Sequence, residues 1–96
     1  MNDAIERFVN ALNEAWREDD RWFTYQTGDK YAKIVAVNPA SRSAYAFVVL
    51  SDGDKFKAGD ILKPASWAAP ARNKARGHIS DPAAFIARHS RYGMGA

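Results

Sequence analysis

The first twenty residues place apolar side chains at the period of an α-helix. The apolar positions, spaced by three or four residues, are Ile5, Phe8, Val9, Leu12, Ala15 and Trp16. This spacing gathers them on one stripe of a helix with 3.6 residues per turn, and most polar side chains fall outside the stripe. Asn2 or Asp3 can cap the first turn. The pattern predicts a helix over about residues 3–18.

From Arg21 onward the apolar period changes to two, which is typical of β-strands. Stretches of β-branched and aromatic residues alternate with short turn sequences at residues 27–30, 38–41 and 51–54. In the third stretch, Tyr45, Phe47 and Val49 are expected to share one face. Short connections favour antiparallel neighbours, so we expect a three- to four-stranded meander. The predicted strands cover about residues 21–27, 31–37, 43–50 and 61–63.

A second helix is predicted near the end of the chain. Asp81-Pro82 is a typical start, with Asp81 as the cap and Pro82 in the first turn. This helix is expected over about residues 82–91, and residues 92–96 are expected to fray. The prediction is one α+β domain over residues 1–96. In it, a long N-terminal helix packs on the meander, with the short C-terminal helix beside it.

The aromatic residues divide into two groups. One group follows the apolar stripes and is expected in the core: Phe8, Trp16, Phe23, Phe47 and Phe85. The other is expected on the sheet: Trp22, Tyr25, Tyr31 and Tyr45. There the rings either stack on nucleic-acid bases or are covered by the helix, and both interpretations stay open.

Charge is distributed unevenly along the chain. The net charge is +3, but residues 1–20 hold two cations against six acids, and residues 63–96 hold six cations against one acid. Such polarity can steer an anionic partner towards the basic part. There is no cysteine, which excludes disulfides and thiolate metal sites. The start has no signal-peptide pattern and the apolar run 44–50 is too short to span a bilayer, so we expect a cytoplasmic protein.

The segment KPASWAAPARNKARG, residues 63–77, is the most unusual stretch of the chain. The candidate binding residues are in or next to it: Lys63, Trp67, Arg72, Lys74, Arg76 and His78. Two prolines favour an ordered, extended connector whose cations could bind phosphates. In the alternative interpretation, Trp67 is buried as an anchor and the cations are merely solvated. The exposure of Trp67 distinguishes the two.

Catalytic and metal-binding patterns are missing from the sequence. Neither a nucleophile elbow nor a phosphate-binding glycine loop occurs. The adjacent Asp19 and Asp20 have no converging base, and the spacing of His78 and His89 fits no zinc site. We therefore expect a protein that is not an enzyme and has no catalytic residues, metal or cofactor.

The run from Ala58 to Gly77 resembles a segment of small uncharacterised bacteriophage proteins. The similarity lies in AGDILKPASWAAPAR followed by ARG, and it extends over the C-terminal two-thirds of the chain without the first helix. This resemblance implies a phage accessory protein in the cytoplasm of an infected bacterium, and it implies no activity. Two functions remain: contact with a nucleic-acid backbone through the basic C-terminal surface, or binding that inhibits or redirects a bacterial host protein.

Overall fold

The computed structural model describes residues 2–94. Its elements are α1 (Asn2–Trp16), β1 (Trp22–Thr27), β2 (Tyr31–Val37), β3 (Arg42–Val49), β4 (Asp60–Leu62), β5 (Gly77–His78) and α2 (Pro82–Arg88). The strands form one sheet in the order β1-β2-β3-β4-β5, and every neighbouring pair is antiparallel. The predicted α+β fold is confirmed, with a fifth strand, β5, that is too short to leave an apolar period in the sequence.

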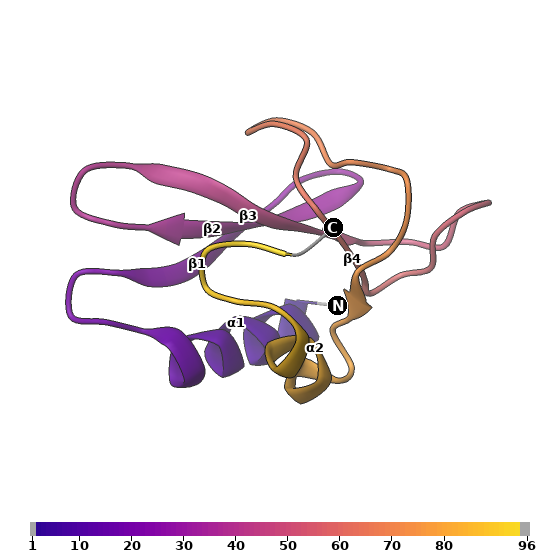
Figure 1. Ribbon diagram of the computed structural model, residues 1–96. Coiled ribbons are helices and arrows are strands. Elements are labelled where there is room, and N and C mark those ends of the chain that lie inside the picture. The colour runs from indigo at the N-terminus through magenta and orange to yellow at the C-terminus, as the bar shows by residue number, and fades with distance from the viewer. Residues whose placement is uncertain (1, 95–96) are drawn as a thin grey trace.

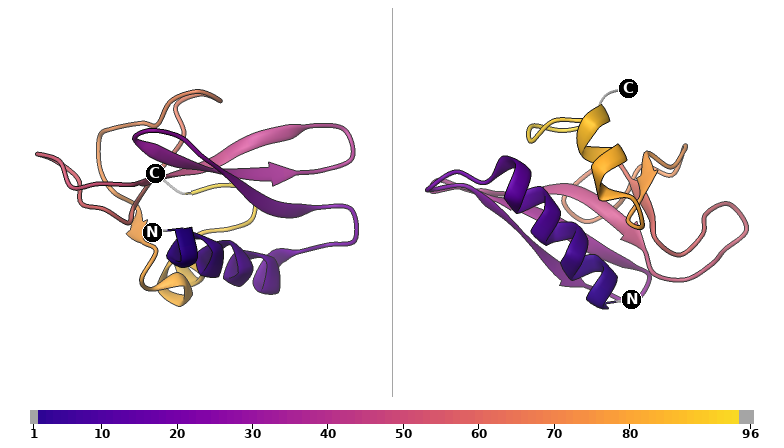
Figure 2. Two further views of the ribbon diagram at one scale, coloured as in Figure 1. Left: turned by 180° about the vertical axis from the view of Figure 1, so that it is seen from behind. Right: turned by 90° about the horizontal axis from the view of Figure 1, so that it is seen from below.

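Both helices lie on the same face of the sheet (Figures 1 and 2). The apolar stripe of α1 buries Ile5, Phe8, Val9 and Leu12 against this face. Asp81 caps α2 as predicted, because its Oδ1 accepts a hydrogen bond from the N–H of Ala84 at 3.1 Å. α2 ends at Arg88, since His89 takes an extended backbone conformation. The helix is therefore shorter than predicted.

A β-bulge in β3 changes the predicted assignment of side chains to faces. Ile34 pairs with Ala46 and Val35 pairs with Ala44, so Tyr45 is an extra residue without a partner on β2. Tyr45 consequently joins the helix-side core together with Ala46, and Phe47 and Val49 pack on the opposite face. The prediction that Tyr45 shares a face with Phe47 and Val49 was wrong because a bulge shifts the alternation by one residue.

The sheet has a second apolar face, which we call the outer face, on the side away from the helices. Its buried residues form a separate cluster, the outer cluster, made of Phe47, Val49, Phe56 and Leu62. Phe56 comes from the loop between β3 and β4 and is buried there although it lies outside any strand. The connector between β4 and β5, residues 63–76, also lies over this side of the sheet (Figure 1).

The segment after α2 packs against the domain instead of fraying. Met94 is buried in the helix-side core. The hydroxyl of Tyr45 donates a hydrogen bond to the carbonyl of Ser90 at 2.6 Å, and Arg91 forms an ion pair with Glu18. The prediction of fraying was therefore wrong for residues 92–94, and residues 95 and 96 lie outside the described residues.

The side chain of Asn13 joins α1 to the edge strand β1. Its Nδ2 donates to the carbonyl of Phe23 at 3.0 Å, and its Oδ1 accepts from the N–H of Phe23 at 2.8 Å. One amide therefore pairs both backbone groups that Phe23 presents at the open edge of the sheet.

We predict that Asn13→Ala lowers the free energy of unfolding by about 1–3 kcal/mol, because two partly buried backbone groups lose their partners. Urea denaturation measures the change. Asn10→Ala is the matched control, since Asn10 is exposed on the same helix and gains the same helix propensity. Equal unfolding free energies for the two variants would contradict the role of Asn13.

Candidate nucleic-acid interface

The first part of the connector is a closed loop and not the extended segment that the prolines predicted. Pro64 and Pro70 lie opposite each other in a β-bridge. The N–H of Ala71 donates to the carbonyl of Lys63 at 2.7 Å, and the N–H of Ser66 donates to the carbonyl of Ala69 at 3.1 Å. We call residues 63–71 the Trp67 loop, because these bonds hold Trp67 at its tip.

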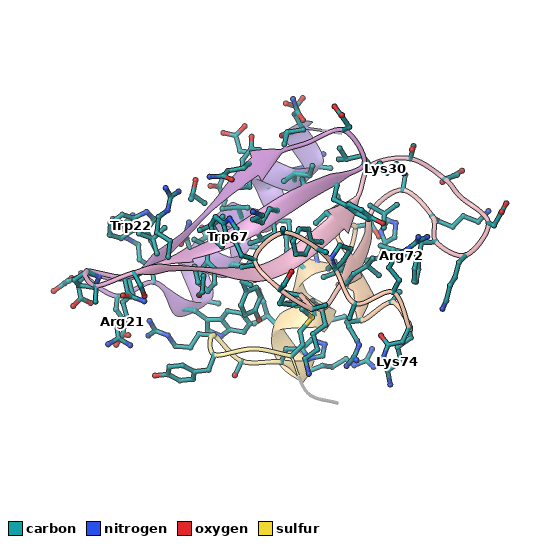
Figure 3. The ribbon with its side chains drawn as sticks, turned by 90° about the horizontal axis from the view of Figure 1, so that it is seen from above. Arg21, Trp22, Lys30, Trp67, Arg72 and Lys74 are labelled. Atoms are coloured by element: carbon teal, nitrogen blue, oxygen red, sulfur yellow. The ribbon has the colours of Figure 1, made fainter. Side chains whose placement is uncertain are left out.

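Trp67 lies over the outer face of the sheet (Figure 3). The ammonium of Lys33, in β2, is 3.7 Å from the centre of the indole ring, which is a close cation–π contact. The residue is 46% exposed. Trp67 is therefore neither a buried anchor nor a free ring: Lys33 covers one side of the indole, and much of the remaining surface faces solvent.

Cations line two small hollows beside the Trp67 loop. One hollow, of about 250 Å³, includes Lys30, Tyr31, Lys33 and Ala68 in its lining. The other, of about 190 Å³, includes Lys30, Tyr31, Phe56 and Arg72. Since Lys30 and Tyr31 border both, the hollows adjoin on the outer face. Asp29 borders the first hollow and Asp52 the second.

The second half of the connector is tied to the loop that carries Phe56. Nζ of Lys55 donates to the carbonyl of Arg72 at 2.6 Å. The guanidinium of Arg72 lies 5.9 Å from the centre of the Phe56 ring. These contacts fix Arg72 near the outer cluster although its side chain is exposed. Lys74 follows on the same side of the molecule and is also exposed (Figure 3).

The structure divides the six predicted site residues among three places. Trp67, Arg72 and Lys74 lie on the outer-face side. Lys63, at the base of the Trp67 loop, lines a different cleft, at the end of the sheet.

Arg76 and His78 hold the sheet and the segments around it together. The N–H of Arg76 donates to the carbonyl of Ile61 at 2.7 Å, and its carbonyl lies 3.2 Å from Nε2 of His89. The ring of His78 lies 2.9 Å from both the hydroxyl of Ser80 and the carbonyl of Ala58. These hydrogen bonds give Arg76 and His78 a structural role.

Lys30 and Lys33 were missed as site residues because they lie outside the basic C-terminal third. The signal was in β2, where Lys33 stands between Ala32 and Ile34, both fully buried. A lysine at an alternating position of a strand indicates a face that is not fully covered.

The aromatics predicted on the sheet lie on different sides of it. Tyr31 packs against the outer cluster, whereas Tyr25 and Tyr45 belong to the helix side. Trp22 is 38% exposed at the start of the edge strand. The five predicted core aromatics are confirmed. Three are buried in the helix-side core, where Trp16 packs half-buried beside them, and Phe47 is buried in the outer cluster.

The ion pairs of the described residues lie away from the cations of the outer face, although Asp29 and Asp52 border the hollows. Within residues 2–94, the ion pairs are Arg21 with Asp20 and Arg91 with Glu18, and neither involves Lys30, Lys33, Arg72 or Lys74. In the same part of the chain, no group of three acidic or histidine side chains is arranged to hold a metal ion. Neither α1 nor α2 has the length and apolar character needed to cross a membrane.

We predict that Trp67→Ala lowers the unfolding free energy by only about 1–2 kcal/mol, because the ring is half exposed and its contact with Lys33 is a single cation–π pair. Phe56→Ala, in the buried outer cluster, should cost about 3–5 kcal/mol. Chemical denaturation of the two variants compares them directly. A loss for Trp67→Ala as large as that for Phe56→Ala would mean that Trp67 is a structural anchor.

Comparison with known proteins assigns the chain to a family. No curated protein and no solved structure matches the chain. The model of a family of unknown function, DUF7717, matches residues 2–91. The matched region includes both helices, all five strands and the connector. The chain therefore belongs to the DUF7717 family.

Proposed function

We propose that the protein binds single-stranded nucleic acid along the outer face of its sheet. Trp67 stacks on a base, and the phosphates are contacted by Lys30, Arg72 and Lys74. The observation that carries the proposal is the contact between Trp67 and Lys33, which holds an exposed indole at the tip of an ordered loop. On the same face, Lys30, Arg72 and Lys74 form no ion pair within residues 2–94.

The order of the Trp67 loop supports the proposal. A ring that is fixed before binding loses little conformational entropy when a base stacks on it. Lys33 adds positive charge beneath the ring, where a strand of phosphates passing over the face would be attracted to it. Stacking on one ring requires an unstacked base, which a single strand offers and a duplex does not.

The separation of charge between the two sides of the domain also favours this face. The acidic residues of the first helix, Asp3, Glu6 and Glu14, are exposed on α1, which covers the opposite side of the sheet. These three acids outnumber the exposed cations of the helices, Arg7 and Arg88, so a polyanion is attracted more strongly to the outer face than to the helix side. Given the resemblance of residues 58–77 to phage proteins, the proposed setting is the cytoplasm of an infected bacterium.

We predict that binding of a single-stranded oligonucleotide weakens steeply as salt increases. Each phosphate contact contributes about 0.7 to the slope of log K against log salt, so the double variant Lys30→Ala with Arg72→Ala should reduce the slope by about 1.4. Trp67→Ala should weaken binding roughly tenfold through lost stacking. Fluorescence anisotropy at several salt concentrations measures both effects.

The matched control is the double variant Arg7→Ala with Arg88→Ala. It removes the same charge, but from exposed positions on the two helices, and should leave the slope unchanged. Equal slopes for the two double variants would mean that only net charge matters and would exclude the outer face as the site. If no oligonucleotide binds even at low salt, the proposal is wrong, and a host protein would be the alternative partner for this surface.

A further inference from the structure

A larger cleft lies at the end of the sheet, next to the unpaired half of β3. β4 pairs only with Phe47 and Val48, so the earlier residues of β3 have no neighbouring strand on that side. The start of the connector and the segment after α2 border this part of β3 instead. The space they enclose has a volume of about 460 Å³, and we call it the tail cleft. Its volume is within the range of pockets that bind small ligands.

The charged side chains that line the tail cleft are all cationic. Arg21, Lys63 and Arg91 reach it from three separate segments, and among residues 2–94 no Asp or Glu lines it. Arg91 is paired with Glu18, and Nε of Arg21 lies 3.8 Å from Asp20 in a pair that is largely exposed. Lys63 has no ion pair among residues 2–94. Lys63 can therefore bind an anion without breaking an ion pair, and an exposed pair such as Arg21 with Asp20 rearranges at little cost.

Two exposed aromatic rings border the same cleft. Trp22 is 38% exposed and Tyr92 is 80% exposed, and with Trp67 they are the large exposed apolar residues of the described chain. Deeper in the cleft, Tyr45 already donates its hydroxyl hydrogen to Ser90. Burial raises the pKa of the Tyr45 phenol, so it stays neutral and adds no negative charge. The cleft thus combines stacking surfaces with cations.

We propose that the tail cleft binds one nucleotide, with the base against Tyr92 and the phosphate at Lys63 and Arg21. This site goes beyond the proposed function, because none of the described residues that line it also lines a hollow of the outer face. The nucleotide can be a free mononucleotide or the 5′-phosphorylated end of a strand, since both present the same chemistry.

The test is a calorimetric titration of the full chain with adenosine 5′-monophosphate. Adenine is a suitable probe because stacking tolerates every base. We expect a dissociation constant of about 1 mM or lower, and binding about tenfold weaker for adenosine or inorganic phosphate alone. Lys63→Ala and Tyr92→Ala should each weaken binding of the mononucleotide about tenfold. Tyr92 is so exposed that its variant retains the fold.

The variant Lys30→Ala with Arg72→Ala is the control that separates the two sites. It should leave binding of the mononucleotide unchanged while it weakens binding of oligonucleotides to the outer face. The tail-cleft proposal is overturned if adenosine 5′-monophosphate does not bind at about 10 mM, or if Lys63→Ala and Tyr92→Ala leave its binding intact. Either result leaves salt-dependent strand binding by the outer face untouched.

Two oligonucleotides that differ only in a 5′-phosphate identify the source of the nucleotide. If the phosphorylated strand binds more tightly and Lys63→Ala removes the difference, the ligand is the end of a strand. If the two strands bind equally while the mononucleotide depends on Lys63, the ligand is a free nucleotide. Both results support a nucleotide site in the cleft.

Discussion

Burial of a second apolar face is the constraint on which the position of the candidate interface depends. The two helices cover one side of the sheet, but Phe47, Val49 and Leu62 project from the other side and must also be removed from water. The chain covers them with loops: Phe56 packs into the cluster, and the connector crosses above it. A loop that serves as a cover must be ordered, and its order fixes Trp67 and Arg72 on this face.

The loops cover the outer face incompletely, and the cations of the candidate interface border the part that stays open. Helices would bury an apolar face more fully, whereas the Trp67 loop leaves Lys30, Lys33 and Tyr31 bordering open hollows. The ammonium of Lys33 lies against the indole ring of Trp67. This contact joins the loop to the sheet through a charged group and an aromatic ring. At the end of the sheet, the shortness of β4 leaves the tail cleft open in the same way. Both candidate sites therefore lie where no helix or neighbouring strand covers the sheet.

The sequence predicted what depends on local periodicity and did not predict what depends on contacts between distant segments. The apolar stripe of α1 and the alternation in β2 gave the two elements within a few residues of their bounds. The bulge at Tyr45 leaves no compositional trace, so its face was assigned wrongly. The bridge between Pro64 and Pro70 closes the Trp67 loop, and the presence of two prolines does not by itself predict that they pair. Of the proposed interface, Arg72 and Lys74 were predicted from local charge and Trp67 from its place in the segment 63–77. Lys30 was not predicted, because only the fold brings it beside Arg72.

The three tryptophans offer the most direct measurement, because each reports on a different part of the molecule. Trp16 packs against the helix-side core, Trp22 borders the tail cleft and Trp67 lies on the outer face. Their indole N–H signals can be followed by NMR while an oligonucleotide without a 5′-phosphate is added at low salt. If the outer face binds the strand, the Trp67 signal shifts most and the Trp16 signal stays in place. A Trp67 signal that does not move while the oligonucleotide saturates the protein would contradict the account.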